Sequence, residues 1–339
     1  MKNRMAMVKT PEVAELVEVD LASLGETQVL IAIKASSICG SDLHIYKGKH
    51  PSAALPVSIG HELSGDVIQA GAGVDKVQVG DRVTVEPVVA CGRCLPCQTG
   101  HYGYCDNLSY HYRKGQGALA DYFVVDQRYV YRLPDQLSYE AGALVEPLAV
   151  AVHAAKRAKI ELGDEVLIIG AGPIGILITA VCKASGAERI IVADIADSRL
   201  EMARALGATE TVNSMDKPLL DIVRQITGGR GISKSFECVG REETFVQAMS
   251  SLRKGGLATI VGIFEQPVIQ IPASLFVSQE IAVQGSQGYC WDFETAIKLT
   301  QTIDLSKLVS HVLDLTEIDK ALKVALTPSE KAVKVVLRP

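Results

Sequence analysis

Hydrophobic and polar positions follow two different patterns along the chain. Up to about residue 135, short β-like runs are separated by glycine and proline turns, as at Gln28–Ala35, Ser64–Ala70, Arg82–Val85 and Asp121–Val125. Runs of this length, bounded by turn residues, are typical of β-strands. The first part of the chain is therefore predicted to be an irregular, mostly antiparallel β domain.

From about Asp164 the pattern changes to apolar strands that alternate with helical segments. The expected strands are Glu165–Ile169, Arg189–Ala193, Ser233–Cys238, Leu257–Val261 and Ile281–Gln284, and the expected helices are Ile174–Ser185, Ser198–Leu206 and Glu242–Leu252. This alternation predicts a parallel sheet covered by helices on both faces. After about residue 286 we expect only a helix at Phe293–Thr300 and a strand at Ala332–Leu337, both rejoining the first domain.

Length and composition narrow the class of protein. A chain of 339 residues exceeds the size at which a single core usually stops growing, so two domains are expected. The net charge of −5 gives no reason to expect nucleic-acid or anionic-membrane partners. No apolar run reaches the roughly 18–20 residues of a membrane helix, and Met1–Thr10 lacks the features of a signal peptide. We therefore expect a cytoplasmic protein.

Four of the eight cysteines form a cluster, Cys91, Cys94, Cys97 and Cys105, with the spacing C-x2-C-x2-C-x7-C. Three thiols this close cannot easily pair as disulfides. Four thiolates can instead surround one tetrahedral zinc ion, and such a closed site holds structure and does no chemistry. Taken alone, the same spacing also resembles an iron–sulfur ligand run. The cluster therefore predicts a structural metal lobe, at about residues 88–108.

A dinucleotide fingerprint follows the strand Glu165–Ile169 directly. It reads Gly170-Ala-Gly172-Pro173-Ile174-Gly175 and opens the next expected helix, whose N-terminus can receive a pyrophosphate. Asp194 comes 19 residues after Gly175, at the end of the second strand, where an acid can bind the adenosine ribose and repel a 2′-phosphate. Arg199 lies close enough in sequence to contact a phosphate. We nevertheless expect NAD and not NADP.

A second group of candidate ligands is scattered through the first domain. Cys39 stands in the turn Cys-Gly-Ser-Asp-Leu-His44, His61 and Glu62 stand in Gly60-His-Glu, and Glu146 stands in Leu144-Val-Glu-Pro. Thiolate, imidazole and carboxylate are the ligands of a catalytic zinc that keeps one position open. Spacing alone does not assemble these residues. Individually they are equally compatible with a buried thiol, a core histidine and solvated acids.

The chain closely resembles the zinc-dependent medium-chain dehydrogenases, the superfamily of alcohol, polyol and threonine dehydrogenases. The family signature G-H-E-x2-G-x5-G-x2-V is complete at Gly60, His61, Glu62, Gly65, Gly71 and Val74, and the four-cysteine lobe is complete as well. The resemblance covers essentially the whole chain. It implies a GroES-like catalytic domain at residues 1–147 and 287–339, and a Rossmann NAD-binding domain at 148–286.

The resemblance also implies roles for individual residues. The catalytic zinc falls on Cys39 and His61, with Glu62 or Glu146 and a water completing its shell, and either acid can be the direct ligand. Ser41 and His44 match the positions that relay the hydroxyl proton outward. Two zinc ions per chain and NAD are implied cofactors, and a homo-oligomer, tetramer or dimer, is implied. The reaction would be oxidation of a secondary alcohol to a ketone by hydride transfer.

Glu146 and the Cys39–His44 turn place the resemblance in the sorbitol, butanediol and threonine dehydrogenase branch. Sorbitol dehydrogenases usually carry a tyrosine where this chain has Ile45 and an arginine where it has Gly288. We therefore expect a vicinal diol, another polyol or a sugar acid as the substrate, in preference to sorbitol. Two alternatives stay open: oxidation of an amino alcohol, as by L-threonine 3-dehydrogenase, and a non-catalytic nucleotide-binding regulator on the same fold.

Overall fold

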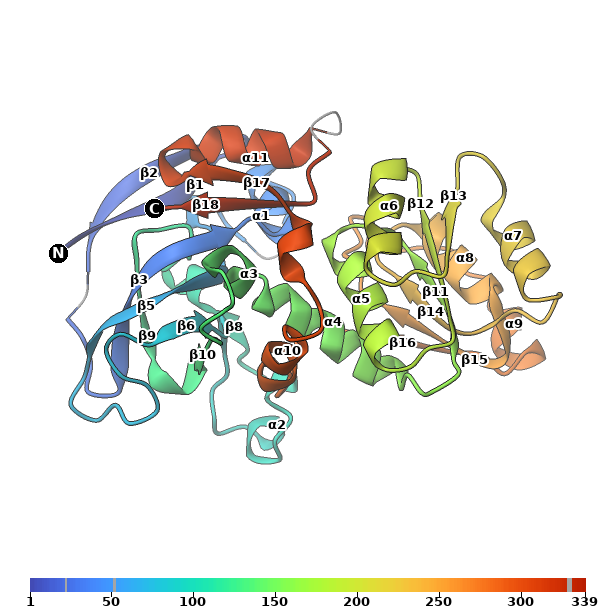
Figure 1. Ribbon diagram of the computed structural model, residues 1–339, viewed down its shortest axis with the longest axis horizontal. Coiled ribbons are helices and arrows are strands. Elements are labelled where there is room, and N and C mark those ends of the chain that lie inside the picture. Colours follow the sequence, from blue (N-terminus) through green and yellow to red (C-terminus); the bar gives the residue numbers. More distant parts are fainter. Residues whose placement is uncertain (22, 51–52, 328–330) are drawn as a thin grey trace. The chain divides into compact units, whose positions relative to one another are not determined.

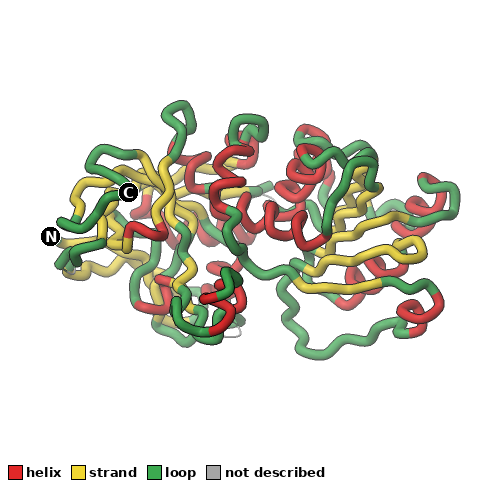
Figure 2. The backbone as a smooth tube through the Cα atoms, turned by 90° about the horizontal axis from the view of Figure 1, so that it is seen from below, coloured by secondary structure: helices red, strands yellow, loops and turns green. Residues whose placement is uncertain are grey.

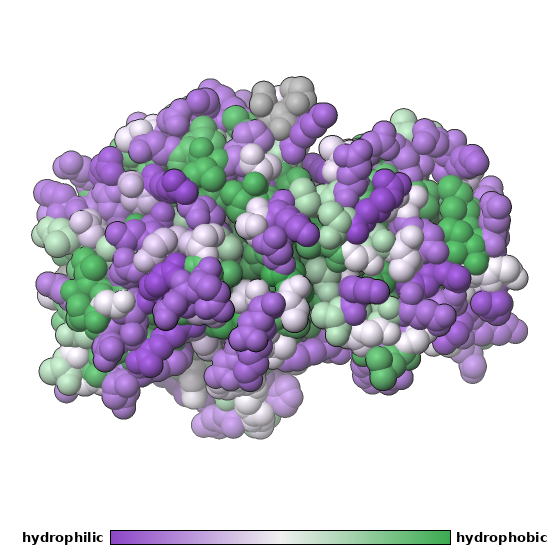
Figure 3. Space-filling model, viewed as in Figure 1, coloured by the Kyte–Doolittle hydropathy of each residue, from purple (hydrophilic) through white to green (hydrophobic). Residues whose placement is uncertain are grey.

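The computed structural model describes residues 1–21, 23–50, 53–327 and 331–339. The chain forms two compact units (Figure 1). Unit 1 consists of Met1–Glu146 and Phe293–Pro339, and unit 2 consists of Pro147–Asp292. None of the helices in the described ranges is long and apolar enough to cross a membrane. The face drawn in Figure 3 is covered mostly by hydrophilic side chains, with apolar ones in small groups.

Unit 1 is built on a seven-stranded sheet. Its path runs β10 (Val130–Arg132), β6 (Arg82–Val85), β5 (Glu62–Ala70), β3 (Gln28–Ser37), β18 (Lys334–Arg338) and β17 (Val309–Asp314), and β9 (Tyr122–Asp126) also pairs with β3. All pairs are antiparallel except that of β17 with β18. Alternate residues of β3, among them Val29, Ile31 and Ile33, enter one apolar core. The mostly antiparallel β domain expected from the sequence is confirmed.

Smaller elements complete unit 1. One three-stranded sheet joins β2 (Val13–Asp20), β1 (Lys2–Thr10) and β4 (Val57–Ser58), and a two-stranded one joins β7 (Val88–Val89) and β8 (Ser109–Tyr110). The α-helices are α1 (Gly40–Tyr46), α2 (Leu95–Gln98), α3 (Tyr139–Ala143), α10 (Phe293–Leu299) and α11 (Ile318–Leu326). The 3-10 helices are η1 (Tyr102–Tyr104), η2 (His111–Lys114), η3 (Gln127–Tyr129), η4 (Leu305–Leu308) and η5 (Leu315–Glu317). A further helix, α4 (Val145–Ala158), begins in unit 1 and continues in unit 2.

Unit 2 is a parallel six-stranded sheet with helices on both faces (Figure 2). Its order is β13 (Glu210–Asn213), β12 (Arg189–Asp194), β11 (Glu165–Ile169), β14 (Ile232–Glu237), β15 (Leu252–Ile260) and β16 (Ala282–Gly285). The other helices are α5 (Pro173–Ala184), α6 (Asp197–Ala205), α7 (Leu219–Ile226), α8 (Glu242–Ser250) and α9 (Ser274–Ser278). The order reverses beside β11, which makes its carboxyl end the binding edge of a doubly wound fold.

One expectation for the C-terminal part was wrong. Besides α10 and β18, the structure has a strand at β17 and a helix at α11. β17 carries polar residues and is only half-buried, because it is an edge strand that pairs with β18. α11 buries Ile318, Ala321 and Leu322 at helical spacing, a pattern that was readable in the sequence. As expected, β18 rejoins the first domain by pairing with β3.

Candidate functional site: a mixed-ligand metal group, a four-cysteine lobe and a dinucleotide cradle

The mixed-ligand group lies where β3 ends and β5 begins. Cys39 follows β3 and caps the N-terminus of α1, and its backbone N–H donates to Oδ2 of Asp42 at 2.9 Å. His61 directly precedes β5, and Glu62 is the first residue of that strand. The antiparallel register sets Ser37 opposite Glu62. Pairing of two strands distant in sequence therefore brings the three candidate ligands together.

Gly60 makes the turn that presents His61. Its φ is +93°, and a Cβ at this position would lie 2.5 Å from the backbone nitrogen of Leu119, so only glycine fits. The Gly60 N–H donates to Oδ1 of Asp42 at 2.9 Å. The same Asp42 oxygen lies 3.7 Å from Nδ1 of His61. Asp42 thus ties the start of α1 to the turn that carries the histidine.

The donor set fits a zinc ion. One donor atom from each of Cys39, His61 and Glu62 lies within 4.8 Å of the other two. His61 and Glu62 are 9% and 0% exposed, and Nδ1 of His61 has no hydrogen-bond partner among the described residues. Burial alone would lower the pKa of His61, but Cys39 and Asp42 raise it well above its usual value. Sulfur, imidazole nitrogen and carboxylate oxygen are the donors of open zinc sites.

A lysine from the far end of the chain balances the charge of Glu62. Nζ of Lys334, on β18, donates to Oε1 of Glu62 at 2.5 Å and lies 3.3 Å from the carbonyl oxygen of Ile38. The Ser37 hydroxyl also donates to Glu62. Burial alone would lower the pKa of Lys334, which is 2% exposed, but Glu62 raises it. Glu62 is therefore held as a paired, buried carboxylate at the edge of the metal group.

The other sequence-predicted residues of this site lie on two helices. Glu146 is buried in the first turn of α4. Burial raises the pKa of Tyr110, and the Glu146 carboxylate raises it further. The same carboxylate also contributes to raising the pKa of His61. In the described chain it lies outside the group of three donors. Ser41 and His44 are half-buried and stand three residues apart on α1, so they share one face of that helix.

Two residues of this site were not predicted from the sequence. Asp42 stands inside the quoted turn Cys-Gly-Ser-Asp-Leu-His and is 1% exposed, so its orienting role could have been suspected from its place between two candidates. Lys334 carried a weaker signal, a lone lysine within the apolar run Val-Lys-Val-Val-Leu. Nothing local indicates that this lysine reaches Glu62, because the two are 272 positions apart.

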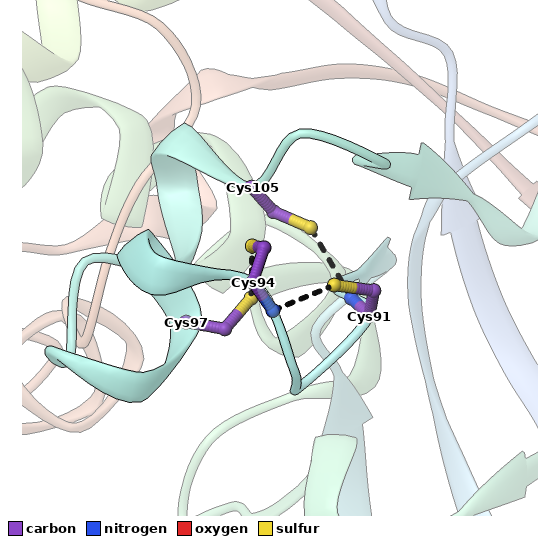
Figure 4. A group of neighbouring side chains, drawn as sticks. All are labelled: Cys91, Cys94, Cys97 and Cys105. Carbon is purple, nitrogen blue, oxygen red and sulfur yellow. Dashed lines mark hydrogen bonds between the residues drawn. The ribbon is translucent and has the colours of Figure 1, made fainter.

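The four-cysteine cluster forms a second donor group. Figure 4 shows its side chains pointing toward one another from the loop after β7, from α2 and from the loop after η1. Their sulfur atoms all lie within 4.8 Å of one another, and the backbone N–H of Cys91 donates to Sγ of Cys105 at 3.2 Å. Backbone N–H groups of Arg93 and Cys94 lower the pKa of Cys91 to about 6. Donated N–H groups and converging sulfurs fit a tetrahedral four-thiolate metal.

The fingerprint forms a cradle at the carboxyl end of β11. Gly170 has φ +98°, and a Cβ there would lie 2.7 Å from Cγ2 of Val239. A Cβ on Gly175 would lie 1.9 Å from the Gly170 oxygen, so close packing of α5 on β11 requires glycine. A Cβ on Gly172 would meet nothing within 4 Å and would occupy the space in front of the α5 N-terminus. Pro173 begins α5, so this end has the geometry that receives a pyrophosphate.

Asp194 ends β12 and is joined to this cradle. Its Oδ2 accepts from the backbone N–H of Ala171 at 2.7 Å, and its Oδ1 accepts from Ile195 and Ala196 at 2.8 and 2.9 Å. A carboxylate has about four lone-pair sites, so capacity for a ribose hydroxyl remains. Arg199 follows on α6.

Comparison with known proteins agrees with this geometry. Residues 25–135 match the alcohol dehydrogenase GroES-like domain family, and residues 173–302 match the zinc-binding dehydrogenase family. Sorbitol dehydrogenase of Bacillus subtilis is 35% identical, over 93% of this chain and 91% of its own length. This chain belongs to the zinc-dependent medium-chain dehydrogenase superfamily. D-arabitol-phosphate dehydrogenase of Enterococcus avium is 32% identical to this dehydrogenase, over 95% of this chain and 94% of its own length.

Solved structures support the same fold for the dehydrogenase. The structure of 2R,3R-butanediol dehydrogenase from Bacillus subtilis superimposes with a TM-score of 0.90 and 32% identity, and 99% of each chain is covered. The expected combination of a GroES-like domain with a Rossmann domain is confirmed. The expected zinc and nicotinamide dinucleotide are confirmed as cofactors of the dehydrogenase, and the iron–sulfur interpretation of the cysteine cluster is set aside.

Proposed function

We propose that this dehydrogenase oxidises a secondary hydroxyl of a polyol or vicinal diol to a ketone, with NAD as the hydride acceptor. The observation that carries the proposal is the convergence of Cys39, His61 and Glu62 at the β3–β5 junction. Three protein donors of these types leave one position for a substrate oxygen. The names of the similar proteins, a sorbitol, an arabitol-phosphate and a butanediol dehydrogenase, favour polyhydroxy substrates.

We assign the metal ligands to Cys39, His61 and Glu62, and give Glu146 a neighbouring role. Glu62 belongs to the group of donors within 4.8 Å, and one of its about four lone-pair sites remains after Lys334 has donated to both oxygens and Ser37 to one of them. A bound zinc ion supplies a Lewis acid that lowers the pKa of an alcohol, and NAD supplies a hydride acceptor. The four-cysteine lobe would hold the second zinc and contribute to stability alone.

The protein's own part in the chemistry is to position groups and move a proton. Asp42 orients His61, as carboxylates commonly do for metal-binding histidines. Ser41 would accept the proton of the substrate hydroxyl, and His44, one turn further along α1, would pass it outward. The Asp194 carboxylate would bind the adenosine ribose, and the residues from Gly170 to Gly175, with Pro173 and Ile174 between them, would hold the pyrophosphate. Arg199 is assigned a place beside the adenosine end.

The test is turnover of the zinc-loaded protein with NAD and a panel of alcohols. The panel contains primary alcohols, secondary alcohols, vicinal diols, polyols, sugar acids and L-threonine, and ketone products are identified by NMR. We expect secondary hydroxyls of polyols or diols to give the highest kcat/KM. Cys39→Ala should abolish turnover, whereas Cys182→Ala, which removes a buried thiol on α5, should keep it.

Two further outcomes define the proposal. Ser41→Ala should lower kcat on the order of 100-fold, with the largest effect at low pH, while the KM for NAD stays unchanged. No NAD reduction with any alcohol, in protein that carries zinc at both sites, would contradict the proposal and favour a nucleotide-binding regulator. Highest activity with L-threonine would show that the substrate is an amino alcohol and not a polyol.

We infer a homo-oligomeric enzyme, dimer or tetramer, that works in the cytoplasm. Thiolates of the cysteine lobe need a reducing compartment to remain available for metal. Light scattering on the purified holoenzyme, and fractionation of the source cells, test the two statements.

A further inference from the structure

Basic side chains gather around the mixed-ligand group of unit 1. The segment Leu43–His50 contains His44, Lys47, Lys49 and His50 and no acidic residue, and η2 contains Arg113 and Lys114. His111 of η2 adds no positive charge near neutral pH, because its ring packs edge-on against Phe123 and Tyr129 and burial lowers its pKa to about 4. The two segments approach the site from different parts of the chain. The first continues from α1, and the second follows β8 and is tied to β4 by a hydrogen bond from Oγ of Ser58 to the Tyr112 carbonyl at 3.1 Å. Residues of both segments lie near the metal group, since Arg113, His44 and His61 all act electrostatically on His50.

Two tyrosines connect the metal group to Arg113. The Tyr112 ring lies 6.0 Å from the His61 ring and 5.5 Å from the Tyr110 ring, measured between centroids. The Arg113 guanidinium lies 5.4 Å from the centroid of Tyr110 and 5.7 Å from that of Tyr112. Only one aromatic ring thus separates the guanidinium from a candidate zinc ligand. The planar guanidinium is pre-oriented by the rings, as cation–π contacts of arginine commonly are.

The charges in this region act on one another. Burial lowers the pKa of His50 first, and the positive charges of Arg113 and His44 lower it further. Among the causes of this shift, only the carboxylate of Asp42 opposes it, and that carboxylate already accepts from Cys39 and Gly60. His50 is therefore mainly uncharged near neutral pH, whereas Arg113 keeps its positive charge at any pH. A bound anion would interact favourably with that charge, so the arrangement favours an anionic group beside Arg113.

We propose that the substrate of this dehydrogenase is a polyol with an anionic end, a phosphate or a carboxylate, and that Arg113 determines this specificity. The inference rests on the proposed function, because it places the reacting hydroxyl at Cys39, His61 and Glu62. Arg113 then binds the opposite end of the same molecule, with Tyr110 and Tyr112 lining the path between them. Arginine suits either anion, because its fork of N–H donors matches carboxylate and phosphate oxygens in pairs.

The test compares three substrates with one carbon skeleton: a neutral pentitol, its terminal phosphate and the corresponding aldonate. The kcat/KM for NAD reduction is measured with wild type, Arg113→Met and Lys114→Met. Lys114 is an exposed cation on the same helix and serves as the matched control. Wild type and the control should prefer one anionic substrate by about tenfold or more, since a hydrogen bond to a charged group commonly has that effect. Arg113→Met should lose this preference and keep its activity with the neutral pentitol.

The two anionic arms decide which group is recognised. Higher kcat/KM with the phosphate identifies a polyol phosphate, and higher kcat/KM with the aldonate identifies a sugar acid. Equal efficiency for all three substrates in the wild type, or an unchanged preference in Arg113→Met, would overturn the inference while leaving the proposed function intact. Absence of turnover with every alcohol would instead contradict the proposed function.

Binding supplies a readout that does not depend on turnover. Calorimetry with the pentitol phosphate and the aldonate on the zinc-loaded protein should show binding that is weaker by about tenfold or more in Arg113→Met and unchanged in Lys114→Met. The binding should also weaken with added salt, because Arg113 is exposed and its interaction is screened. Identical affinity of wild type and Arg113→Met for both anions would overturn the proposal even if no substrate were turned over.

Discussion

At the scale of single residues, Glu62 and Lys334 depend on each other. Both are almost completely buried, and each is the main charged partner of the other. A buried ion pair contributes little net stability, but removing one partner leaves an uncompensated charge. The pair therefore keeps a carboxylate available beside Cys39 and His61 at low cost in stability.

Lys334→Met should destabilise the zinc-depleted protein by about 3–5 kcal/mol, because Glu62 would remain buried without its partner. The double variant Lys334→Met with Glu62→Gln should be more stable than the single one. Urea unfolding of the two variants and of each single variant measures the coupling. Lys331→Met, an exposed lysine on the same segment, serves as the control. Additive effects would show that the two groups act independently.

Asp194 is expected to set the cofactor preference. Its carboxylate ends β12 and is joined to the fingerprint loop through Ala171. Asp194→Asn keeps the shape and removes the charge that repels a 2′-phosphate. Loss of this repulsion should favour NADP by about 1–2 kcal/mol, and it should therefore lower the ratio of kcat/KM for NAD over NADP by roughly 5- to 30-fold. Asp197→Asn on the adjoining helix is the control, and an unchanged ratio in Asp194→Asn would assign the preference to another group, such as Arg199.

At the scale of elements, the cysteine lobe is a segment with little core of its own. α2 has four residues and none of them is buried, so the lobe depends on its four sulfur atoms to hold its shape. Metal-bound thiolates can supply the folding free energy that apolar burial does not supply here.

Cys94→Ser should lower the zinc content from about two ions per chain to about one, and it should lower the thermal midpoint as well. Cys39→Ser should also lose one zinc but keep the midpoint near that of the wild type. Elemental analysis and thermal unfolding of both variants test this difference. Iron in place of zinc in the wild-type lobe would contradict the assignment.

The last segment of unit 2 is tied to helix α4 by one buried carboxylate. Asp292 accepts from Nζ of Lys156 at 2.6 Å and from the N–H of Cys290 at 2.9 Å, and it lies 2.8 Å from Nδ1 of His153. Burial alone would raise the pKa of Asp292, but His153 and Lys156 lower it below its usual value. Such a group stabilises the folded state at pH values above its unfolded pKa of about 3.9. This stabilisation is lost as the pH falls through the lower pKa of the folded state.

Asp292→Asn should therefore lower the free energy of unfolding by about 1–3 kcal/mol at pH 7, because charge-assisted hydrogen bonds are lost. The difference from wild type should be constant between about pH 7 and 5 and should narrow only below about pH 4. Chemical unfolding of both proteins across this range measures it, with the exposed Asp216→Asn as the control. A difference that grows toward acidic pH would contradict the assigned direction of the pKa shift.

At the scale of the whole molecule, the chain returns to its first unit after building the second. β18 lies between β3 and β17, so the last strand in the sequence is an interior strand of the sheet that carries the metal group. Its side chains Val335, Val336 and Leu337 are 2%, 0% and 0% exposed. Unit 1 is thus complete only when the final residues of the chain are in place.

A chain that ends at residue 333 should lose the fold of unit 1. Burial of three aliphatic side chains at about 1.5–3 kcal/mol each is comparable to the whole stability of a domain. Limited proteolysis should cut unit 1 while unit 2 resists, and zinc at the mixed-ligand group should be lost. A chain that lacks only Pro339 should behave as wild type. Full zinc content in the shorter chain would contradict this dependence on β18.

The sequence alone allowed much of the Rossmann unit to be predicted. β11 and α5 were expected at nearly their observed positions, because a parallel strand is a continuous apolar run and the glycines at its end have specific steric roles. In unit 1 the edge strand β17 was missed, because a half-buried strand leaves only a weak pattern. The helix α11 was missed although its apolar spacing was present.

The functional sites also divide into those that a short segment of sequence contains and those that depend on strand pairing. The cysteine lobe and the glycine fingerprint are short segments whose spacing already contains their geometry, so the sequence by itself determined them. The mixed-ligand group depends on the pairing of β3 with β5 and of β18 with β3. Asp42 and Lys334 joined the site only in the tertiary structure. Contacts across hundreds of positions are decided by how the sheet closes, and no local period of hydrophobic residues specifies them.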